Sequence, residues 1–450
     1  MAAGRLEGDG DVTLGGVAID SRATGPGDLF VALAGEHSDG HAFVRDAISH
    51  GAAAVMARAG ADVPTNVPVV RVDETVAGLQ SLAAAVRGRL DARFVAITGS
   101  SGKTITKELT AAVARARFET IASAASFNNE IGVPLTILEA SDETEVVVSE
   151  VGSRGVGHIA ALMPVLRPDV SVVLNVGPAH IGIFGSLENV AVAKGEIIEG
   201  LAAAGTAILN ADDPAVAAMA SRTQANTITF GTGAMADVRA ENIRLSETGS
   251  ASFTLVAGDG RGDVVLRIPG EHLLPDALAA AAVGTVLGIP ADEAAKALSE
   301  ASGPAWRMQV LHAPEGWRVV NDAYNANPAS TAAALKTLVI LGKGRRTWAV
   351  LGYMAELGET APTEHDRIGR LAVRLGVGRL IVVGEEARPL FEAARLEGMT
   401  PEEATLVADA GAAIAVLRSS LEPGDVVLVK ASRVVGLERV ALAIAGEGAA

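Results

Sequence analysis

The residues best suited to chemistry form the run Thr98-Gly99-Ser100-Ser101-Gly102-Lys103-Thr104. It follows a short apolar run typical of a buried strand, Phe94–Ile97, and precedes apolar residues at helical spacing. Glycines let backbone N–H groups approach phosphate oxygens, a lysine can reach the β and γ phosphates, and a threonine hydroxyl can bind Mg²⁺. The run therefore predicts a phosphate-binding loop. Because Ile97 stands where the strict pattern has its first glycine, a purely structural Gly-Lys-Thr turn is the alternative.

Three more polar residues follow strand candidates or lie on the helices after them. Glu150 comes directly after the strand candidate at 146–149, where it fits a metal ligand or, equally well, a solvated strand end. His180 follows the candidate at 170–176, at the sheet edge where open α/β folds bind ligands. A lone histidine there more often has a structural role. Lys194 lies on the next helical stretch, and its spacing alone indicates a surface residue.

The elements that must position these residues alternate between strands and helices, which predicts an α/β fold. We expect a small mixed α/β N-terminal domain, a central P-loop ATPase-like parallel sheet and a C-terminal Rossmann-like doubly wound sheet. Helical stretches are expected at 41–49, 277–287 and 291–299. The strand candidates of the last two domains lie at 94–97, 145–149, 170–176, 206–209, 318–321, 348–351, 380–383 and 426–429.

The chain length also favours three domains, since 450 residues exceed a single core and domains average about 150 residues. The break at Ser302-Gly303-Pro304 indicates a hinge. We place a substrate-binding domain at 1–88, an ATP-binding ligase domain at 89–312 and an amine-substrate domain at 313–450.

The composition narrows the class of partner. A formal charge of −16 without a basic cluster argues against binding to nucleic acid or anionic lipid. The chain has no cysteine, which excludes disulfides and thiolate metal sites and fits a reducing compartment. No apolar stretch reaches the ~20 residues of a membrane span, and the opening residues do not resemble a secretion signal. We expect a cytoplasmic monomer.

Taken together, the motifs resemble those of the Mur ligases over nearly the whole chain. The C-terminal segments at 306–308, 321–328 and 354–358 resemble most closely the branch of the family that adds D-alanyl-D-alanine. The other matching segments are Asp20-Ser21-Arg22, 27–33, 39–41, 98–104, 128–136, 175–180 and 210–214.

This resemblance implies an ATP- and Mg²⁺-dependent ligase of peptidoglycan synthesis. Its expected substrates are UDP-N-acetylmuramoyl-tripeptide and D-alanyl-D-alanine, joined through an acyl phosphate with release of ADP and phosphate. The diaminopimelate-adding sibling, the runner-up, would carry an Asp-Asn-Pro-Arg motif that this chain lacks. Two further hypotheses are a folate-polyglutamating ligase and an ATP-driven switch protein.

The resemblance also implies roles for individual residues. Gly99 to Thr104, Arg307 and Asp322 would bind ATP, and Lys103, Lys194, His180 and Arg307 would be catalytic. Metal ligands would be Thr104, Glu150, His180 and Lys194, the last as a carbamate, because the family lysine in this segment can be carbamylated. The substrate-binding residues would be Asp20, Ser21, Arg22, Asn128, Asn129, Asn325, Asn327, Lys430 and Ser432.

Two segments depart from the family pattern. Pro275 and Asp276 stand where the family usually has an asparagine close to the adenine, so base recognition can differ here. Tyr353 replaces a residue that is usually acidic. Neither change falls on the phosphate-binding run.

Overall fold

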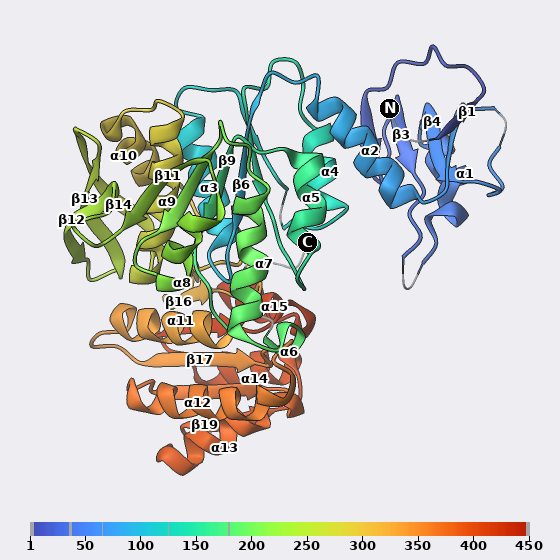
Figure 1. Cartoon of the computed structure of the whole chain (residues 1–450). Helices are drawn as coiled ribbons and strands as arrows, with labels where there is room; N and C mark the ends of the chain where they lie inside the picture. The colour runs from blue at the N-terminus through green and yellow to red at the C-terminus, as the bar shows by residue number, and fades with distance from the viewer. Residues whose placement is uncertain (1–3, 36–37, 65, 125, 179–180, 447–450) are drawn as a thin grey trace.

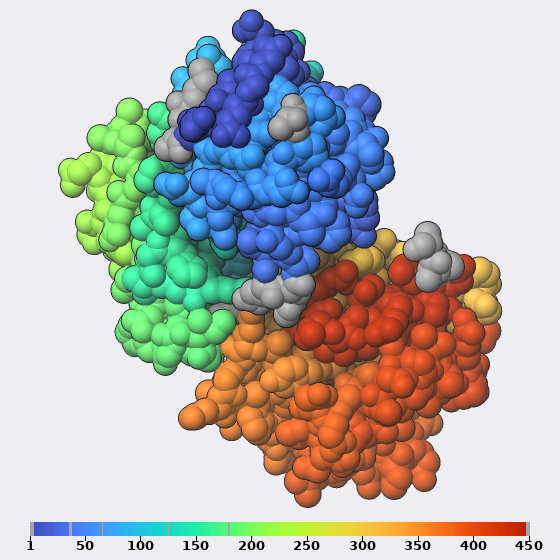
Figure 2. Space-filling view, turned by 90° about the vertical axis from the view of Figure 1, so that its right-hand side faces the viewer, coloured from blue at the N-terminus to red at the C-terminus, as the bar shows by residue number. Residues whose placement is uncertain are grey.

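A computed structural model of the chain describes residues 4–35, 38–64, 66–124, 126–178 and 181–446. Over these residues the chain forms three sheets of five, nine and six strands, each built by one continuous part of the sequence. Figure 1 shows the N-terminal part in blue beside the middle part, with the C-terminal part in orange and red below it. The space-filling view separates the same three lobes (Figure 2). The three-domain α/β prediction is confirmed.

The N-terminal sheet has the order β1-β5-β4-β3-β2 and is parallel except for β1. Its apolar strands bury Phe30 and Val55 against the helix that follows β3. Helix α2 leaves this sheet and packs along α4 and α5 of the middle domain. The elements are β1 (Arg5–Glu7), β2 (Gly16–Ala18), β3 (Asp28–Val31), η1 (Gly40–Phe43), α1 (Val44–Ser49), β4 (Ala54–Arg58), β5 (Val69–Val72) and α2 (Thr75–Arg87).

The middle sheet has the order β14-β13-β12-β11-β10-β9-β6-β8-β7 and is parallel from β7 to β12. Its strands are β6 (Arg93–Thr98), β7 (Thr120–Ala122), β8 (Val146–Glu150), β9 (Val170–Val173), β10 (Thr206–Asn210), β11 (Asn226–Gly231), β12 (Val238–Leu245), β13 (Ser250–Ala257) and β14 (Gly260–Pro269). Its helices are α3 (Lys103–Ala114), α4 (Gly132–Leu138), α5 (His158–Leu166), α6 (Ile181–Phe184), α7 (Leu187–Glu199), α8 (Pro214–Ala217), η2 (Ala218–Arg222), η3 (Glu271–Leu273), α9 (Leu274–Val286) and α10 (Ala291–Glu300).

The buried strand β6 shows why both faces of this sheet carry helices. Side chains alternate along a strand, so Phe94 and Ala96 pack on α5 and α7, while Val95 and Ile97 pack on α3 and α9. A strand that is apolar at every position must be covered on both sides, as parallel sheets are. The carboxyl end of β6 therefore opens at the sheet edge, where the phosphate-binding run begins.

Strands β13 and β14 extend this sheet beyond β12 in antiparallel fashion. The apolar pattern of the sequence predicts no strand at β12, β13 or β14. Helix α10 lies along β14, where Gly262 lets the helix approach so closely that a Cβ would fall 2.6 Å from the Ala295 Cβ. At the same edge the Val265 N–H donates to the Ser299 Oγ at 3.0 Å.

The C-terminal sheet has the order β15-β16-β20-β17-β18-β19 and is parallel except for β15. Helices α11 to α13 pack on one face and α14 and α15 on the other, which confirms the doubly wound prediction. The strands are β15 (Gln309–His312), β16 (Arg318–Asn321), β17 (Thr347–Gly352), β18 (Arg379–Val383), β19 (Ala404–Val407) and β20 (Val426–Lys430). The helices are α11 (Pro328–Leu341), η4 (Gly358–Thr360), α12 (Ala361–Arg374), η5 (Glu385–Ala387), α13 (Arg388–Glu397), α14 (Ala410–Ser420), η6 (Arg433–Val435) and α15 (Glu438–Ala445).

Most predicted elements agree with the structure within a few residues, but the expected strand at 170–176 is shorter. Strand β9 ends at Val173 because the chain then turns toward the phosphate-binding run, where the Ser100 N–H donates to the Asn175 carbonyl oxygen at 3.1 Å. Across the described part of the chain, every helix is too short or too polar to cross a bilayer.

Candidate active site

A cavity of about 1270 Å³ lies between the middle and C-terminal sheets. It is lined by residues at or beyond the carboxyl ends of β6 and β8 on one side and of β16, β17 and β20 on the other, with Gln80 of α2 also present. Open α/β sheets bind ligands at this edge. The predicted residues that line the cavity are Ser100, Ser101, Gly102, Lys103, Thr104, Asn128, Asn129, Glu150, Arg307, Asp322, Asn325, Asn327, Lys430 and Ser432.

The phosphate-binding run connects β6 to α3, as the sequence predicted. Gly102 precedes the helix with φ of +82°, a left-handed conformation that favours glycine. A Cβ there would fall 2.2 Å from an Asp276 carboxylate oxygen, so a larger residue would displace that side chain. The Ser101 N–H donates to the Asn175 Oδ1 at 3.0 Å. The loop is held open at a helix N-terminus, the arrangement that binds phosphate.

Lys103 is partly exposed at the cavity wall, and its Nζ donates to the carbonyl oxygen of Gly99 at 2.9 Å. Desolvation lowers the pKa of Lys103, the Glu150 carboxylate opposes this shift, and the charge of Arg307 adds to it. A phosphate bound in the loop would give the ammonium a partner with negative charge.

Thr104 and Glu150 form the part of the site that fits a metal ion. The Thr104 Oγ1 donates to one Glu150 oxygen at 2.7 Å, and the Asn128 Nδ2 donates to the other at 2.7 Å. Glu150 is 1% exposed. No cluster of three or more His, Asp or Glu residues suited to a metal occurs in the described ranges. A hydroxyl and a carboxylate beside a phosphate loop suit Mg²⁺, which usually keeps waters and phosphates as its other ligands.

Lys194 lies on α7 and is buried, contrary to the surface position that its spacing alone indicated. Its Nζ donates to the Ser153 Oγ at 3.0 Å. Burial lowers the pKa of Lys194 to about 7, and the nearby Lys103 charge acts in the same direction. Ser153 lines the cavity whereas Lys194 does not. A neutral amine is the form that reacts with CO₂, so the setting suits a carbamate.

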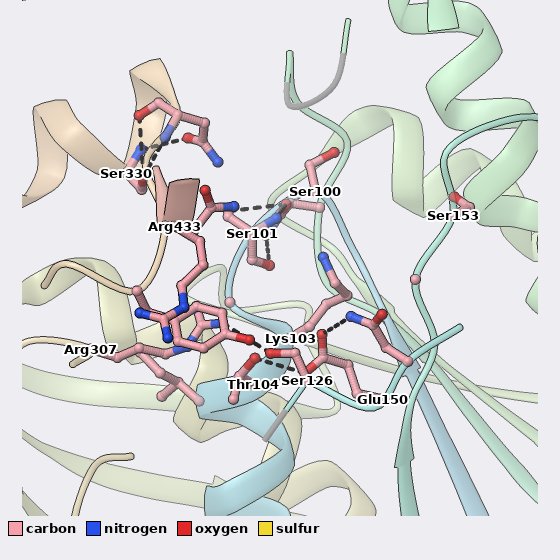
Figure 3. A pocket seen from close by; sticks show the side chains of 18 of the residues that line it. Ser100, Ser101, Lys103, Thr104, Ser126, Glu150, Ser153, Arg307, Ser330 and Arg433 are labelled. Carbon is pink, nitrogen blue, oxygen red and sulfur yellow. Dashed lines mark hydrogen bonds between the residues drawn. The ribbon is translucent and has the colours of Figure 1, made fainter. Parts of the chain in front are cut away.

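Arg307 lines the cavity, and the residues before and after it have left-handed backbone conformations. Trp306 and Met308 have φ of +61° and +51°, and such non-glycine positions cost of order 1–3 kcal/mol each. The Asp322 Oδ1 accepts the Met308 N–H at 3.1 Å, and the guanidinium lies 4.1 Å from the Tyr324 ring centroid. These contacts hold Arg307 at the wall of the cavity (Figure 3).

Asp322 and Lys430 form a buried ion pair at the carboxyl ends of β16 and β20. The Lys430 Nζ donates to the Asp322 Oδ2 at 2.5 Å and to the carbonyl oxygen of Asn325 at 2.9 Å. Ser432 accepts the Ala355 N–H at 2.9 Å, which joins the connection after β17 to the same wall. The predicted C-terminal residues therefore meet in one place.

Two of the predicted asparagines also shape the backbone. Asn129 accepts the Gly132 N–H at 2.9 Å at the start of α4. Asn327 caps α11 by accepting the Ser330 N–H at 2.9 Å, and Ser330 donates back to the carbonyl oxygen of Asn327 at 3.2 Å. Local capping is a structural reason for these residue types.

The three N-terminal candidates lie apart from the cavity. Asp20 accepts from the Arg22 side chain, with Nη2 at 2.6 Å from Oδ2, and this bond lowers the pKa of Asp20 to about 2. Arg22 is 86% exposed, and the Ser21 carbonyl oxygen accepts from His50 at 2.8 Å. None of the three is among the described cavity-lining residues. His180 lies outside the described residues.

Several residues at the site were not predicted. The Ser126 Oγ lies 3.5 Å from the Arg307 Nη2, and the Ser153 Oγ accepts a hydrogen bond from the Lys194 Nζ. Neither belongs to a motif, and only its place after β7 or β8 could have drawn attention to it. Asn175, which belongs to a matching segment, proves to hold the phosphate loop. In Figure 3, Arg307 and Arg433 reach the site from one side and Lys103, Glu150 and Ser153 from the other.

The two departures from the family pattern have different surroundings. Pro275 and Asp276 line the cavity at the first turn of α9, and burial raises the pKa of Asp276 to about 7. Tyr353 stacks on His365 with ring centroids 5.1 Å apart, and the His365 Nε2 accepts the Met354 N–H at 2.9 Å. Tyr353 therefore packs on the histidine that holds the Met354 backbone.

The middle and C-terminal domains touch at two glycines beside the cavity. Gly182 of α6 lies against Gly358 of η4 so closely that a Cβ on Gly182 would fall 2.6 Å from the Gly358 nitrogen. Nearby, Arg154 and Glu356 approach within 3.7 Å. A side chain at Gly182 would therefore press on the backbone of the C-terminal domain.

Comparison with known proteins matches the chain to one family. The Mur ligase family catalytic domain matches residues 13–87, the Mur ligase middle domain residues 97–284, and the Mur ligase glutamate ligase domain residues 306–433. The crystal structure of MurF ligase from Thermotoga maritima in complex with ADP has a TM-score of 0.83 at 29% identity, covering 98% of this chain and 99% of that one.

Two relatives are similar over nearly their whole length, and both are named UDP-N-acetylmuramoyl-tripeptide--D-alanyl-D-alanine ligase. The Mycobacterium tuberculosis protein is 44% identical over 96% of this chain and 92% of its own. The Escherichia coli protein is 36% identical over 99% of this chain and 96% of its own. With three family domains in order and relatives this similar from end to end, the chain belongs to the Mur ligase family.

Proposed function

We propose that this enzyme ligates D-alanyl-D-alanine to the terminal carboxylate of UDP-N-acetylmuramoyl-tripeptide, with conversion of ATP to ADP and phosphate. The observation that carries the proposal is the cavity that brings the phosphate loop together with Arg307 and the Asp322–Lys430 pair of the C-terminal domain. The relatives with this reaction in their name match the chain through all three domains.

The first step activates a carboxylate, which is a poor acylating agent at neutral pH. The γ-phosphoryl group of ATP passes to the tripeptide carboxylate, and Lys103 and Arg307 stabilise the charge on the transferring group. Thr104 and Glu150 would hold Mg²⁺, which would supply further positive charge there. The dipeptide amine then attacks the acyl carbon, the C–O bond to phosphate breaks, the amine loses a proton, and an amide remains. This route needs no protein nucleophile.

The three domains divide the substrates. Residues 1–88 would bind the UDP end through Asp20, Ser21 and Arg22, residues 89–312 would bind ATP, and residues 313–450 would bind the dipeptide through Asn325 and Asn327. Lys194 would carry a carbamate that joins the metal site. Domain closure about the hinge at 302–304 would keep water from the acyl phosphate. A monomer in the cytoplasm remains the prediction from the sequence.

Phosphate release tests the proposal directly. With ATP, Mg²⁺ and UDP-N-acetylmuramoyl-tripeptide present, release should require D-alanyl-D-alanine, and the product should gain the mass of the dipeptide less water. Diaminopimelate or glutamate in its place should support no release, and Lys103→Ala should abolish it. Release at the same rate without any amine would refute the ligase and favour an ATP-driven switch.

A further inference from the structure

Lys107 is a buried cation that the proposed chemistry does not use. It lies on α3 four residues after Lys103, so the two side chains project from the same side of the helix. Lys103 lines the cavity, whereas Lys107 is not among the described lining residues and is fully buried. Buried lysines are rare unless paired, so the contacts of Lys107 indicate its role.

The ammonium of Lys107 holds the chain at the end of β7. Its Nζ donates to the carbonyl oxygen of Ser123 at 2.5 Å and lies 2.8 Å from the Glu108 Oε1. Hydrogen bonds from a charged donor are stronger than neutral ones. The position of Ser123 is therefore fixed from the phosphate-binding helix itself.

Ser123 is in turn bonded to β8, which carries Glu150. The Ser123 N–H donates to the Val148 carbonyl oxygen at 3.0 Å, and the Ser123 Oγ accepts the Glu150 backbone N–H at 3.1 Å. A displacement of Ser123 would thus be felt at the backbone of Glu150.

The chain after Ser123 supplies two side chains to the site. Asn128 donates to the Glu150 carboxylate at 2.7 Å, and its carbonyl oxygen accepts the Gly152 N–H at 2.8 Å. Ser126 lies 3.5 Å from Arg307. Ser123 therefore holds the backbone of Glu150, and Asn128 holds its carboxylate.

From this chain of contacts, we propose that Lys107 is a positioning residue for the metal–nucleotide site. Through Ser123, whose Oγ accepts the Glu150 backbone N–H, it fixes the place of the Glu150 carboxylate beside Thr104, where Asn128 also holds that carboxylate. The inference rests on the proposed nucleotide site but not on the identity of the amine or acyl substrate.

The experiment measures ADP binding by calorimetry as a function of Mg²⁺ concentration, with no ligase substrate present. Lys107→Met should raise the Mg²⁺ concentration for half-maximal ADP binding about tenfold or more, as loss of an outer-shell partner commonly does. ADP binding in EDTA should change little, and Lys107→Arg should restore part of the Mg²⁺ response. Ser123→Ala removes the next link without touching the lysine and should shift the response in the same direction.

Val113→Ala is the matched control, because Val113 is buried on the same helix six residues farther along. If this variant raises the Mg²⁺ requirement as much as Lys107→Met, the lysine only stabilises the fold and the inference is wrong. An unchanged requirement in both Lys107→Met and Ser123→Ala also refutes it. Wild-type protein that binds Mg²⁺ and ADP but releases no phosphate would contradict the ligase proposal alone.

Discussion

Replacing Asp276 by asparagine should remove a pH-dependent cost to folding. The carboxylate is buried at the first turn of α9, accepts the Thr106 hydroxyl at 3.0 Å and lies against Gly102. Burial raises its pKa from 3.8 to about 7, although Thr106 and Arg307 both act to lower it. An amide of the same shape keeps the Thr106 contact and cannot ionise.

The sign and size follow from proton linkage. Between pH 3.8 and about 7 the folded protein keeps a proton on Asp276 that the unfolded chain has lost. The contribution of Asp276 to the free energy of unfolding is therefore greatest at low pH. It falls by about 1.4 kcal/mol per pH unit as the pH rises to the pKa of the folded state. The whole loss is at most about 4 kcal/mol, of which about 2 kcal/mol falls above pH 5.5. Above pH 7 the cost is constant.

Urea unfolding of the wild type and of Asp276→Asn at several pH values from 5.5 to 8.5 tests this. The variant should gain about 2 kcal/mol relative to the wild type between pH 5.5 and 7 and then keep a constant lead. Taking the difference between the two proteins cancels every other titrating group. A difference that does not change with pH would show that Asp276 ionises as a solvated carboxyl does.

Three further predictions concern the domain contact, the buried amine and the buried ion pair. Gly182→Ala places a methyl group 2.6 Å from the Gly358 nitrogen, so the domains should close less completely; kcat should fall, and solution scattering with all substrates bound should give a larger radius of gyration than for the wild type. An unchanged radius would contradict this. Lys194, with a pKa near 7, should form a carbamate with ¹³C-bicarbonate at pH 8 and lose it below pH 6.5, seen by NMR and absent in Lys194→Arg. No signal at pH 8 would exclude the carbamate. Lys430→Met leaves the buried Asp322 without its cation and should destabilise the protein by roughly 3–5 kcal/mol, measured by urea unfolding. An equal midpoint would show that the pair adds nothing.

The sequence predicted the fold well where one strand carries its own signal. Strand β16 was expected at 318–321 and is found there, because a buried parallel strand is a short apolar run between turns. Strands β12 to β14 were missed. In β13 buried positions alternate with half-buried ones, as at Phe253 and Thr254, and in β14 charged residues such as Arg261 and Asp263 interrupt the apolar pattern. These strands form a sheet because they pair with one another. A short stretch of sequence read by itself does not show that pairing.

The site residues, like the strands, could be predicted from sequence only where the signal is local. A loop such as 98–104 is local, so its chemistry could be predicted from a few neighbouring residues. The pairing of Asp322 with Lys430 joins residues 108 apart, and the burial of Lys194 depends on how α7 packs. A lysine on a helix looks the same in sequence whether it faces water or a core. For these residues only the resemblance to a family indicated a role.

The covered edge strand β14 of the nine-stranded sheet has a consequence for aggregation. An exposed edge strand has unpaired N–H and C=O groups that can bond to a strand of another molecule. Native proteins therefore cover such edges, which prevents aggregation. Helix α10 covers this edge at β14. Its Ser299 accepts the Val265 N–H, and its alanines pack directly on Gly262. A larger residue at Gly262 would push the helix away and expose a strand ready to pair with a second copy. The small residues on this edge therefore help to keep the protein from assembling strand to strand.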